Sequence, residues 1–210
     1  MMATAPSYPP PAATPVVAVL SPQYCVGHAV EFTITRKMMT MEAGTFGITD
    51  ANGNIVFKVK GKFLSLHDRR VLLDAAGNPI ITFQQKMMTA HRRWQAFRGE
   101  STDPKDMIFS VRKSKMMMMM KTKLSVFMAA NVGEEHSDFR IQGNWWETAC
   151  NIYVGDTDNI VAQMHRKHSA QSILLGKDTF CVTIYPNVDH AFIVALVVIL
   201  EEINQDRRAS

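Results

Sequence analysis

The stretch Ala191–Leu200, with the sequence AFIVALVVIL, decides the fold of this chain. A membrane-spanning helix needs about 20 apolar residues, so this run is too short to cross a bilayer and predicts no transmembrane segment. Its β-branched residues suit a buried strand, while Asp189 or Asn187 can cap the start of a helix and Arg207–Arg208 suits the far end. A helix that is apolar on every side must be surrounded by protein. We favour a helix over about 187–204, wrapped by a sheet.

The residues before this run have the pattern of β-strands. Apolar and other side chains alternate along Ile55–Lys60, and a period of two buries one set on the inner face of a sheet. Similar alternation occurs around Phe32 and Ile34, Met107–Arg112, Asp138–Gln142 and Phe180–Tyr185. Asn, Asp and Gly in 50–54, 74–79 and 155–159 indicate hairpin turns between strands. The pattern predicts roughly a dozen strands, at the spacing typical of a sandwich or barrel.

Composition fits one globular domain. The chain has 210 residues, is 47% hydrophobic and 20% charged, and carries a formal net charge of +4. A disordered or fibrous chain is excluded by this apolar content. Six prolines within 1–22 indicate a disordered proline-rich tail without the pattern of a secretory signal, followed by a single domain over 23–210. Three distant cysteines favour reduced thiols in a cytosolic protein.

Basic residues are the main candidates for a binding site. Arg forks and Lys point charges suit phosphate groups, and several of these residues fall where strands end, so a barrel can gather them on one rim. The alternative is solubilising charge scattered over the surface. The candidate ligands for an anionic headgroup are Arg69, Arg70, Arg92, Arg93, Arg112, Lys113, Lys115, Lys121, Arg166 and Lys167.

Several phrases of the chain, in order over about residues 20 to 206, resemble the plant LURP-one-related family. They are Arg36–Met39, Phe46–Asn54, Leu66–Asp74, His91–Trp94, Gln163–His168, Leu175–Asp178 and Tyr185–Asp189. The resemblance implies a fold similar to the tubby carboxy-terminal domain and to phospholipid scramblases, a closed antiparallel barrel of about twelve strands around a central hydrophobic helix. It also implies a role in plant defence, and the tubby relatives imply phosphoinositide binding and membrane tethering. The run Met116–Met120 departs from the mixed strand expected there.

Enzyme and metal motifs are mostly absent. No G-x-S-x-G, P-loop, G-x-G-x-x-G or H-E-x-x-H sequence occurs, so we expect no catalytic residue, cofactor or metal. His165 and His168, with His136 or a cysteine, form at most an incomplete zinc site. Cys150 and Cys181 leave a thiol-dependent activity as one alternative.

The sequence predicts a non-enzymatic module that binds an anionic phospholipid or a protein partner at a basic barrel rim. We expect it in the cytoplasm, peripherally at the plasma membrane, or in the nucleus. A nuclear, DNA-associated regulator is the second alternative, and its binding would weaken steeply with salt.

Overall fold

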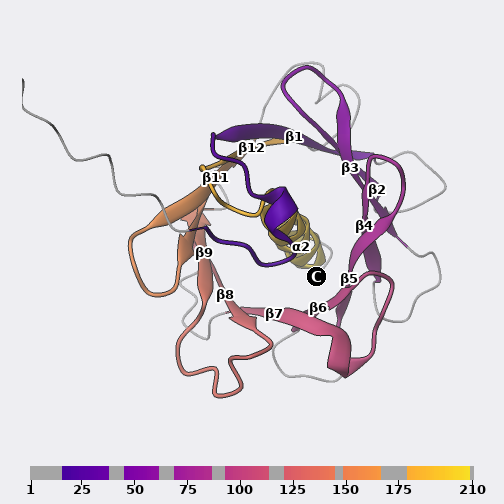
Figure 1. The fold of residues 1–210 in the computed structure, drawn as a ribbon. Coiled ribbons are helices and arrows are strands. Elements are labelled where there is room, and N and C mark those ends of the chain that lie inside the picture. The colour runs from indigo at the N-terminus through magenta and orange to yellow at the C-terminus, as the bar shows by residue number, and fades with distance from the viewer. Residues whose placement is uncertain are drawn as a thin grey trace, which may run out of the picture.

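Twelve β-strands form a closed antiparallel barrel around one long helix, α2 (Figure 1). The computed structural model describes residues 16–37, 45–61, 69–86, 93–113, 121–144, 149–166 and 179–208. The strands are β1 (Val30–Lys37), β2 (Thr45–Thr49), β3 (Ile55–Gly61), β4 (Arg70–Asp74), β5 (Pro79–Gln85), β6 (Trp94–Arg98), β7 (Met107–Lys113), β8 (Lys121–Met128), β9 (Phe139–Asn144), β10 (Ala149–Val154), β11 (Ile160–Arg166) and β12 (Thr179–Ile184). Two short 3₁₀ helices, η1 (Pro22–Tyr24) and η2 (Pro104–Asp106), are not part of the barrel wall. The long helix α2 spans His190–Arg208.

Each strand pairs with its neighbours in sequence, and β1 closes the barrel against β12. In that closing pair Ile34 lies opposite Phe180, and Phe32 lies opposite Val182. Closure leaves no free sheet edge in the barrel, which removes the usual template for aggregation. The predicted fold class, a closed β-barrel with a central carboxy-terminal helix, is confirmed.

The apolar run Ala191–Leu200 lies inside the barrel, and all ten of its residues are buried. The strands supply the surrounding shell by their alternation, as in β3, where Phe57 and Val59 are buried and Lys60 is exposed. Phe192 packs against Phe109 of β7, with ring centroids 5.2 Å apart. Each large apolar side chain buried in this way contributes about 1.5–3 kcal/mol, so helix and wall stabilise each other.

The predicted hairpin turns form where Asp, Asn and Gly occur. Asp50 Oδ1 accepts hydrogen bonds from the backbone N–H groups of Asn52 and Asn54, at 2.9 and 2.8 Å. Gly53 adopts φ +84°, a conformation that favours glycine. The turn at Asp74 repeats this arrangement with Asn78. In both turns the hydrogen bonds hold the pKa of the aspartate below its usual value.

The barrel has two different ends. The turn end carries the turns 50–54, 75–78 and 155–159, and α2 begins there after β12. At the opposite end α2 finishes, and the strands begin or end at several basic residues. We call it the basic end, after Lys37, Arg70, Lys113, Lys121 and Arg166.

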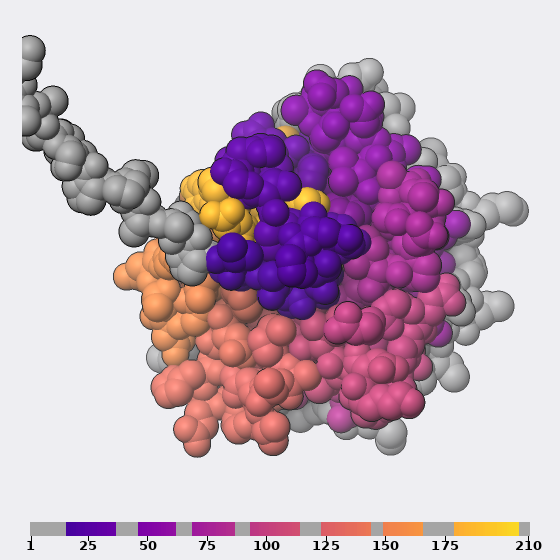
Figure 2. All heavy atoms as spheres, viewed as in Figure 1, coloured from indigo at the N-terminus to yellow at the C-terminus, as the bar shows by residue number. Residues whose placement is uncertain are grey.

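Residues 16–28 cross the mouth of the barrel at the turn end (Figure 2). Val17 bridges to Val188, and Val19 and Leu20 pack against the core. The Oδ2 atom of buried Asp189 accepts hydrogen bonds from the N–H groups of Val19, Leu20 and Ser21, at 3.1, 2.6 and 3.1 Å. This carboxylate therefore fixes the segment to the start of α2.

The structure differs in two respects from the predicted boundaries. Of the disordered tail expected over 1–22, residues 1–15 lie outside the described residues, whereas Val17, Val19 and Leu20 pack against the core and Asp189 binds the backbone of residues 19–21. The helix, expected over about 187–204, spans His190–Arg208. Asp189 caps it as one of the two predicted candidates, since its Oδ1 accepts from the Phe192 N–H at 3.0 Å. Within the described residues, no helix is long and apolar enough to cross a membrane. The run Met116–Met120 lies outside the described residues.

Replacing Asp189 with alanine is expected to destabilise the protein strongly. The change leaves four backbone N–H groups without their carboxylate acceptor, and we expect a loss of about 3 kcal/mol in the free energy of unfolding. Urea denaturation measures this loss. Asp158→Ala, at a fully exposed carboxylate, is the control and should cost less than about 0.5 kcal/mol. Equal effects of the two changes would show that Asp189 does not have this role.

Candidate functional site

The basic residues predicted to bind an anion divide between the described and undescribed parts of the chain. Side chains are described for Arg69, Arg70, Arg93, Arg112 and Lys113. For Lys121 and Arg166 the backbone positions are described, and Arg92, Lys115 and Lys167 lie outside the described residues. The described positions occur at or beside strand ends of the basic end.

Arg70 faces the inside of the barrel and holds the helix. Its side chain is 10% exposed, and its Nη2 lies 2.9 Å from Oε2 of Glu202, whose side chain is 8% exposed. The Arg70 Nε donates to Oε1 of the same carboxylate at 3.4 Å. This fork-to-fork pair connects β4 to the last turns of α2, so the Arg70 guanidinium is occupied by a structural partner.

Two more basic residues follow the same inward alternation. Arg36 follows Ile34 by two positions on β1, and its guanidinium lies 5.5 Å from the ring centroid of buried Phe46. Lys113 follows inward-facing Val111 by two positions on β7. Opposite these strand ends the helix carries the buried polar residues Glu201, Glu202 and Asn204. Of the predicted basic residues, Arg70 and Lys113 are thus on the inward side of the wall, together with Arg36, which was not among them.

Arg93 and Arg112 face outward and share one carboxylate. Arg93 immediately precedes β6 and Arg112 lies on the neighbouring strand β7, where Val111 pairs with Trp94 of β6. Both Nη atoms of Arg93 lie 2.6 Å from the carboxylate oxygens of Glu134, and Arg112 Nη1 lies 3.2 Å from Oε2. The hydrogen bond from Arg93 holds the pKa of Glu134 below its usual value. The two arginines therefore bind an anion in the resting structure, and that anion belongs to the chain itself.

The outward row continues across the next strands. Arg112 pairs with Ser125 of β8, which pairs with Arg140 of β9. Arg112 lies over the ring of Phe127, 4.5 Å from its centroid, and Arg140 lies over the ring of Tyr153 at 4.7 Å. Such stacking orients a guanidinium and leaves its edge available for hydrogen bonds.

Arg140 and Glu134 were not among the predicted site residues. Arg140 stands alone in a strand of mixed polarity, and the pairing register, which the sequence did not specify, is what aligns it with Arg112. Glu134 lies in the long β8–β9 connection, and only the fold brings it against Arg93, 41 residues away. Alternation alone, however, indicates that Arg112 and Arg140 face outward, because each precedes or follows a buried apolar residue.

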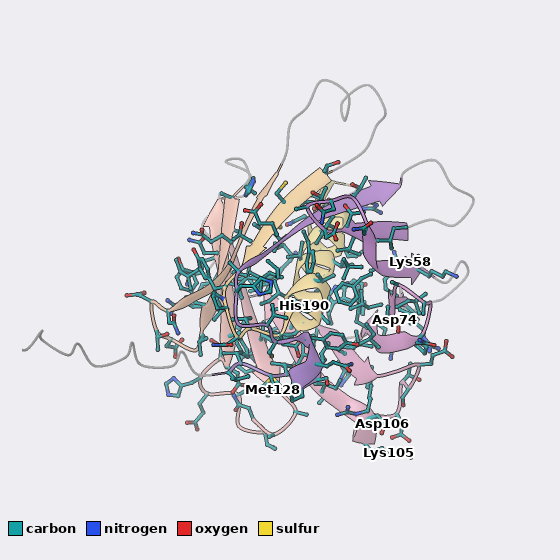
Figure 3. All side chains as sticks on the ribbon, turned by 45° about the horizontal axis from the view of Figure 1, so that its top comes forward. Lys58, Asp74, Lys105, Asp106, Met128 and His190 are labelled. Carbon is teal, nitrogen blue, oxygen red and sulfur yellow. The ribbon has the colours of Figure 1, made fainter. Side chains whose placement is uncertain are left out.

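The turn end has a cleft of about 410 Å³ between the N-terminal segment and the β4–β5 turn. Tyr24, Asn78, Pro79 and Arg98 contribute to its lining. Lys58, Asp74, Lys105 and Asp106 lie around the outside of the barrel, whereas His190, the first residue of α2, lies inside (Figure 3). Burial lowers the pKa of His190, whose ring packs against Tyr24 and Phe32.

The cysteines and histidines do not converge on a common site within the described residues. Cys25, Cys150 and Cys181 are free thiols, and burial raises the pKa of Cys150 to about 11. His136 lies in the β8–β9 connection of the turn end, while His165 lies near the opposite end of β11. No group of three potential metal ligands occurs in the part of the chain that the structure describes. His168 lies outside that part.

Truncation of Arg70 is expected to weaken the fold itself. Arg70→Ala leaves the Glu202 carboxylate buried without its partner, which costs about 3–5 kcal/mol. The double change Arg70→Met with Glu202→Leu replaces the pair by apolar side chains and should recover most of that loss. Chemical denaturation of both variants tests this. A stable Arg70→Ala protein would contradict the structural role.

The Glu134 pair should show a defined pH dependence. Because its folded pKa is lowered, Glu134 contributes stability above the unfolded pKa of about 4.3, and this contribution disappears as pH falls through the folded value. Glu134→Gln should therefore be less stable than the parent near neutral pH, and the difference should shrink in acid. Unfolding free energies across the acid range measure it. Glu135→Gln, at the exposed neighbouring residue, should show no such trend, and a constant difference for Glu134→Gln would refute the assignment.

Comparison with known proteins agrees with the fold and the resemblance. The sequence profile described as LURP-one-related matches residues 30–201. The chain is 52% identical to Protein LURP-one-related 15 of Arabidopsis thaliana, over 91% of this chain and 88% of that protein. It is 47% identical to Protein LURP-one-related 10 of the same plant, over 90% and 98%. An X-ray structure of an Arabidopsis thaliana protein, 45% identical, superposes with a TM-score of 0.70 and covers 89% of this chain and 98% of that one. The chain belongs to the LURP-one-related family.

Proposed function

We propose that this protein is a non-enzymatic binding module that attaches its basic end to anionic membrane surfaces, with phosphoinositide headgroups as its ligands. The observation that carries the proposal is the separation of charge between the described side chains at the two ends of the barrel. On this proposal the protein is cytoplasmic and peripheral at the plasma membrane, and it has the role in plant defence that the family resemblance implies.

Carboxylates gather at the turn end. They come from the hairpin turns and from the connections that precede β7 and β9. Apart from Glu134, which pairs with Arg93 and Arg112, the described acidic side chains of these segments are those of Asp50, Asp74, Glu100, Asp103, Asp106, Glu135, Asp138, Asp156 and Asp158. This end would be repelled by an anionic surface.

The described exposed side chains of the basic end include two lysines, Lys60 and Lys123. Arg69, immediately before β4, donates instead to the backbone oxygen of Glu100 in the β6–β7 connection. Among the described side chains that α2 and the strand ends contribute at this end, the carboxylates belong to Glu201 and Glu202, which are buried. The described side chains that are exposed at this end therefore offer positive charge to an anionic surface.

The energies suit reversible attachment. A basic residue near an anionic membrane contributes about 1 kcal/mol, so a few exposed residues give a binding energy of several kcal/mol. Salt screens such interactions over about 10 Å, so binding should weaken as ionic strength rises. Residues that already have buried partners, such as Arg70, do not add to this sum.

Two features support a binding module over an enzyme or a DNA-binding factor. The raised pKa of Cys150 disfavours the thiolate that a thiol-dependent activity requires. The one long helix among the described elements is enclosed by the barrel, so it does not offer a recognition helix to a DNA groove.

Vesicle flotation tests the proposal with matched variants. The parent protein should float with phosphatidylcholine vesicles that contain a phosphatidylinositol monophosphate. Neutralising Lys60 and Lys123 to Gln should weaken binding by about 2 kcal/mol, roughly thirtyfold. The matched control neutralises Arg98 and Lys105, which are exposed at the turn end, and should change binding less than about threefold. Failure of the folded parent to float, or equal losses in both double variants, would overturn the lipid-binding proposal.

A further inference from the structure

The Arg93–Arg112 pair is bound to a carboxylate of its own chain, in the arrangement that proteins use for phosphate groups. We propose that this pair is a specific phosphomonoester site, and that Glu134 occupies it as an internal placeholder until a ligand displaces it. The inference rests on the proposed function for its ligand class. It names a defined site on the outer wall of the barrel, separate from the diffuse attraction of the basic end.

The geometry is that of a built anion site. Arg93 binds the Glu134 carboxylate with two parallel hydrogen bonds of 2.6 Å, and Arg112 adds a third contact at 3.2 Å. Arg112 is oriented by the Phe127 ring beneath it. The side chains of Arg93, Arg112 and Glu134 are 25%, 35% and 22% exposed, so the group lies at the surface and a small anion can reach it.

The charges at this site do not balance. Two guanidinium groups carry two positive charges, whereas the Glu134 carboxylate supplies one negative charge. A phosphomonoester carries about −1.5 to −2 near neutral pH and has three terminal oxygens that accept hydrogen bonds. It can therefore engage both arginine forks together. Ser125, which pairs with Arg112 on the neighbouring strand, places a hydroxyl in the same row.

The backbone of Glu134 adopts an unfavourable conformation. Its φ is +49°, a left-handed conformation that is uncommon for residues other than glycine. Asn131 holds it there, because its Oδ1 accepts the Glu134 N–H at 3.1 Å. Such a conformation persists only where surrounding contacts enforce it, so the chain places Glu134 beside the arginines at a cost in backbone free energy.

A tethered carboxylate competes with any external ligand. Because Glu134 belongs to the same chain, its effective concentration at the arginines is in the millimolar range or higher. The apparent affinity for an external phosphomonoester is then the intrinsic affinity multiplied by the fraction of molecules in which Glu134 has left the site. Removal of the Glu134 charge should raise that affinity without adding any contact.

Titration with free inositol monophosphate, followed by NMR of the arginine side chains, tests the inference. Glu134→Gln should bind the probe about tenfold more tightly than the parent. Glu135→Gln is the matched control, because it removes the same charge from the exposed neighbouring residue, and its affinity should stay within about twofold of the parent. Arg112→Lys keeps the charge but loses the fork and the stacking, and should weaken binding about tenfold in the Glu134→Gln background. Equal affinities for the parent and Glu134→Gln, or no effect of Arg112→Lys, would overturn the placeholder role.

Two vesicle compositions distinguish this inference from the proposed function. Vesicles with a phosphatidylinositol monophosphate present a phosphomonoester, while vesicles with phosphatidylserine present anionic charge without one. The gain in affinity caused by Glu134→Gln should be larger for vesicles with a phosphatidylinositol monophosphate than for vesicles with phosphatidylserine. Equal gains, with no gain for free inositol monophosphate, would overturn this site and leave attachment by the basic end intact. A gain for the free probe by a protein that floats with neither vesicle would support the site and overturn membrane attachment.

Discussion

The apolar circumference of α2 is the constraint on which the rest of the structure depends. From Ala191 to Leu200 the helix has no polar face, so every side of it must contact protein. A closed barrel satisfies this requirement, since its inward-facing residues surround the helix along its length. Asp189 completes the enclosure at the turn end, where one carboxylate caps the helix and binds three consecutive N–H groups of the N-terminal segment.

The same enclosure determines what the basic residues can do. Alternation along a strand sends one residue inward and the next outward. Arg70, on the inward side, is used to neutralise Glu202 near the end of the helix. Arg93 and Arg112, on the outward side, are held at the surface by Glu134. Basic side chains in this barrel are therefore paired in two separate places, inside the wall against the helix and on its outer surface, and we propose that the outer ones serve recognition.

Much of the fold follows from the sequence, and the candidate site follows only in part. The helix is predictable because ten apolar residues in a row leave few alternatives, and the turns are predictable because Asp50 and Asp74 begin Asp-x-x-Gly-Asn phrases. The packing of residues 17–21 is not predictable from the proline-rich sequence around them, since it depends on the distant carboxylate of Asp189. Basic residues can be recognised as candidates, but their partners come from long-range pairing, as with Arg70 and Glu202, 132 residues apart.

Hydrogen exchange on phosphoinositide-containing vesicles tests the central claim, that the two ends of the barrel have different roles. Exchange at backbone amides reports local opening, and a bound surface slows it. We expect slower exchange on vesicles at the strand ends of the basic end, including Lys60–Gly61 and Val111–Lys113, with little change in the turns 50–54 and 155–159. Protection of the turn end, or the same small change at both ends, would show that the basic end is not the membrane-binding surface.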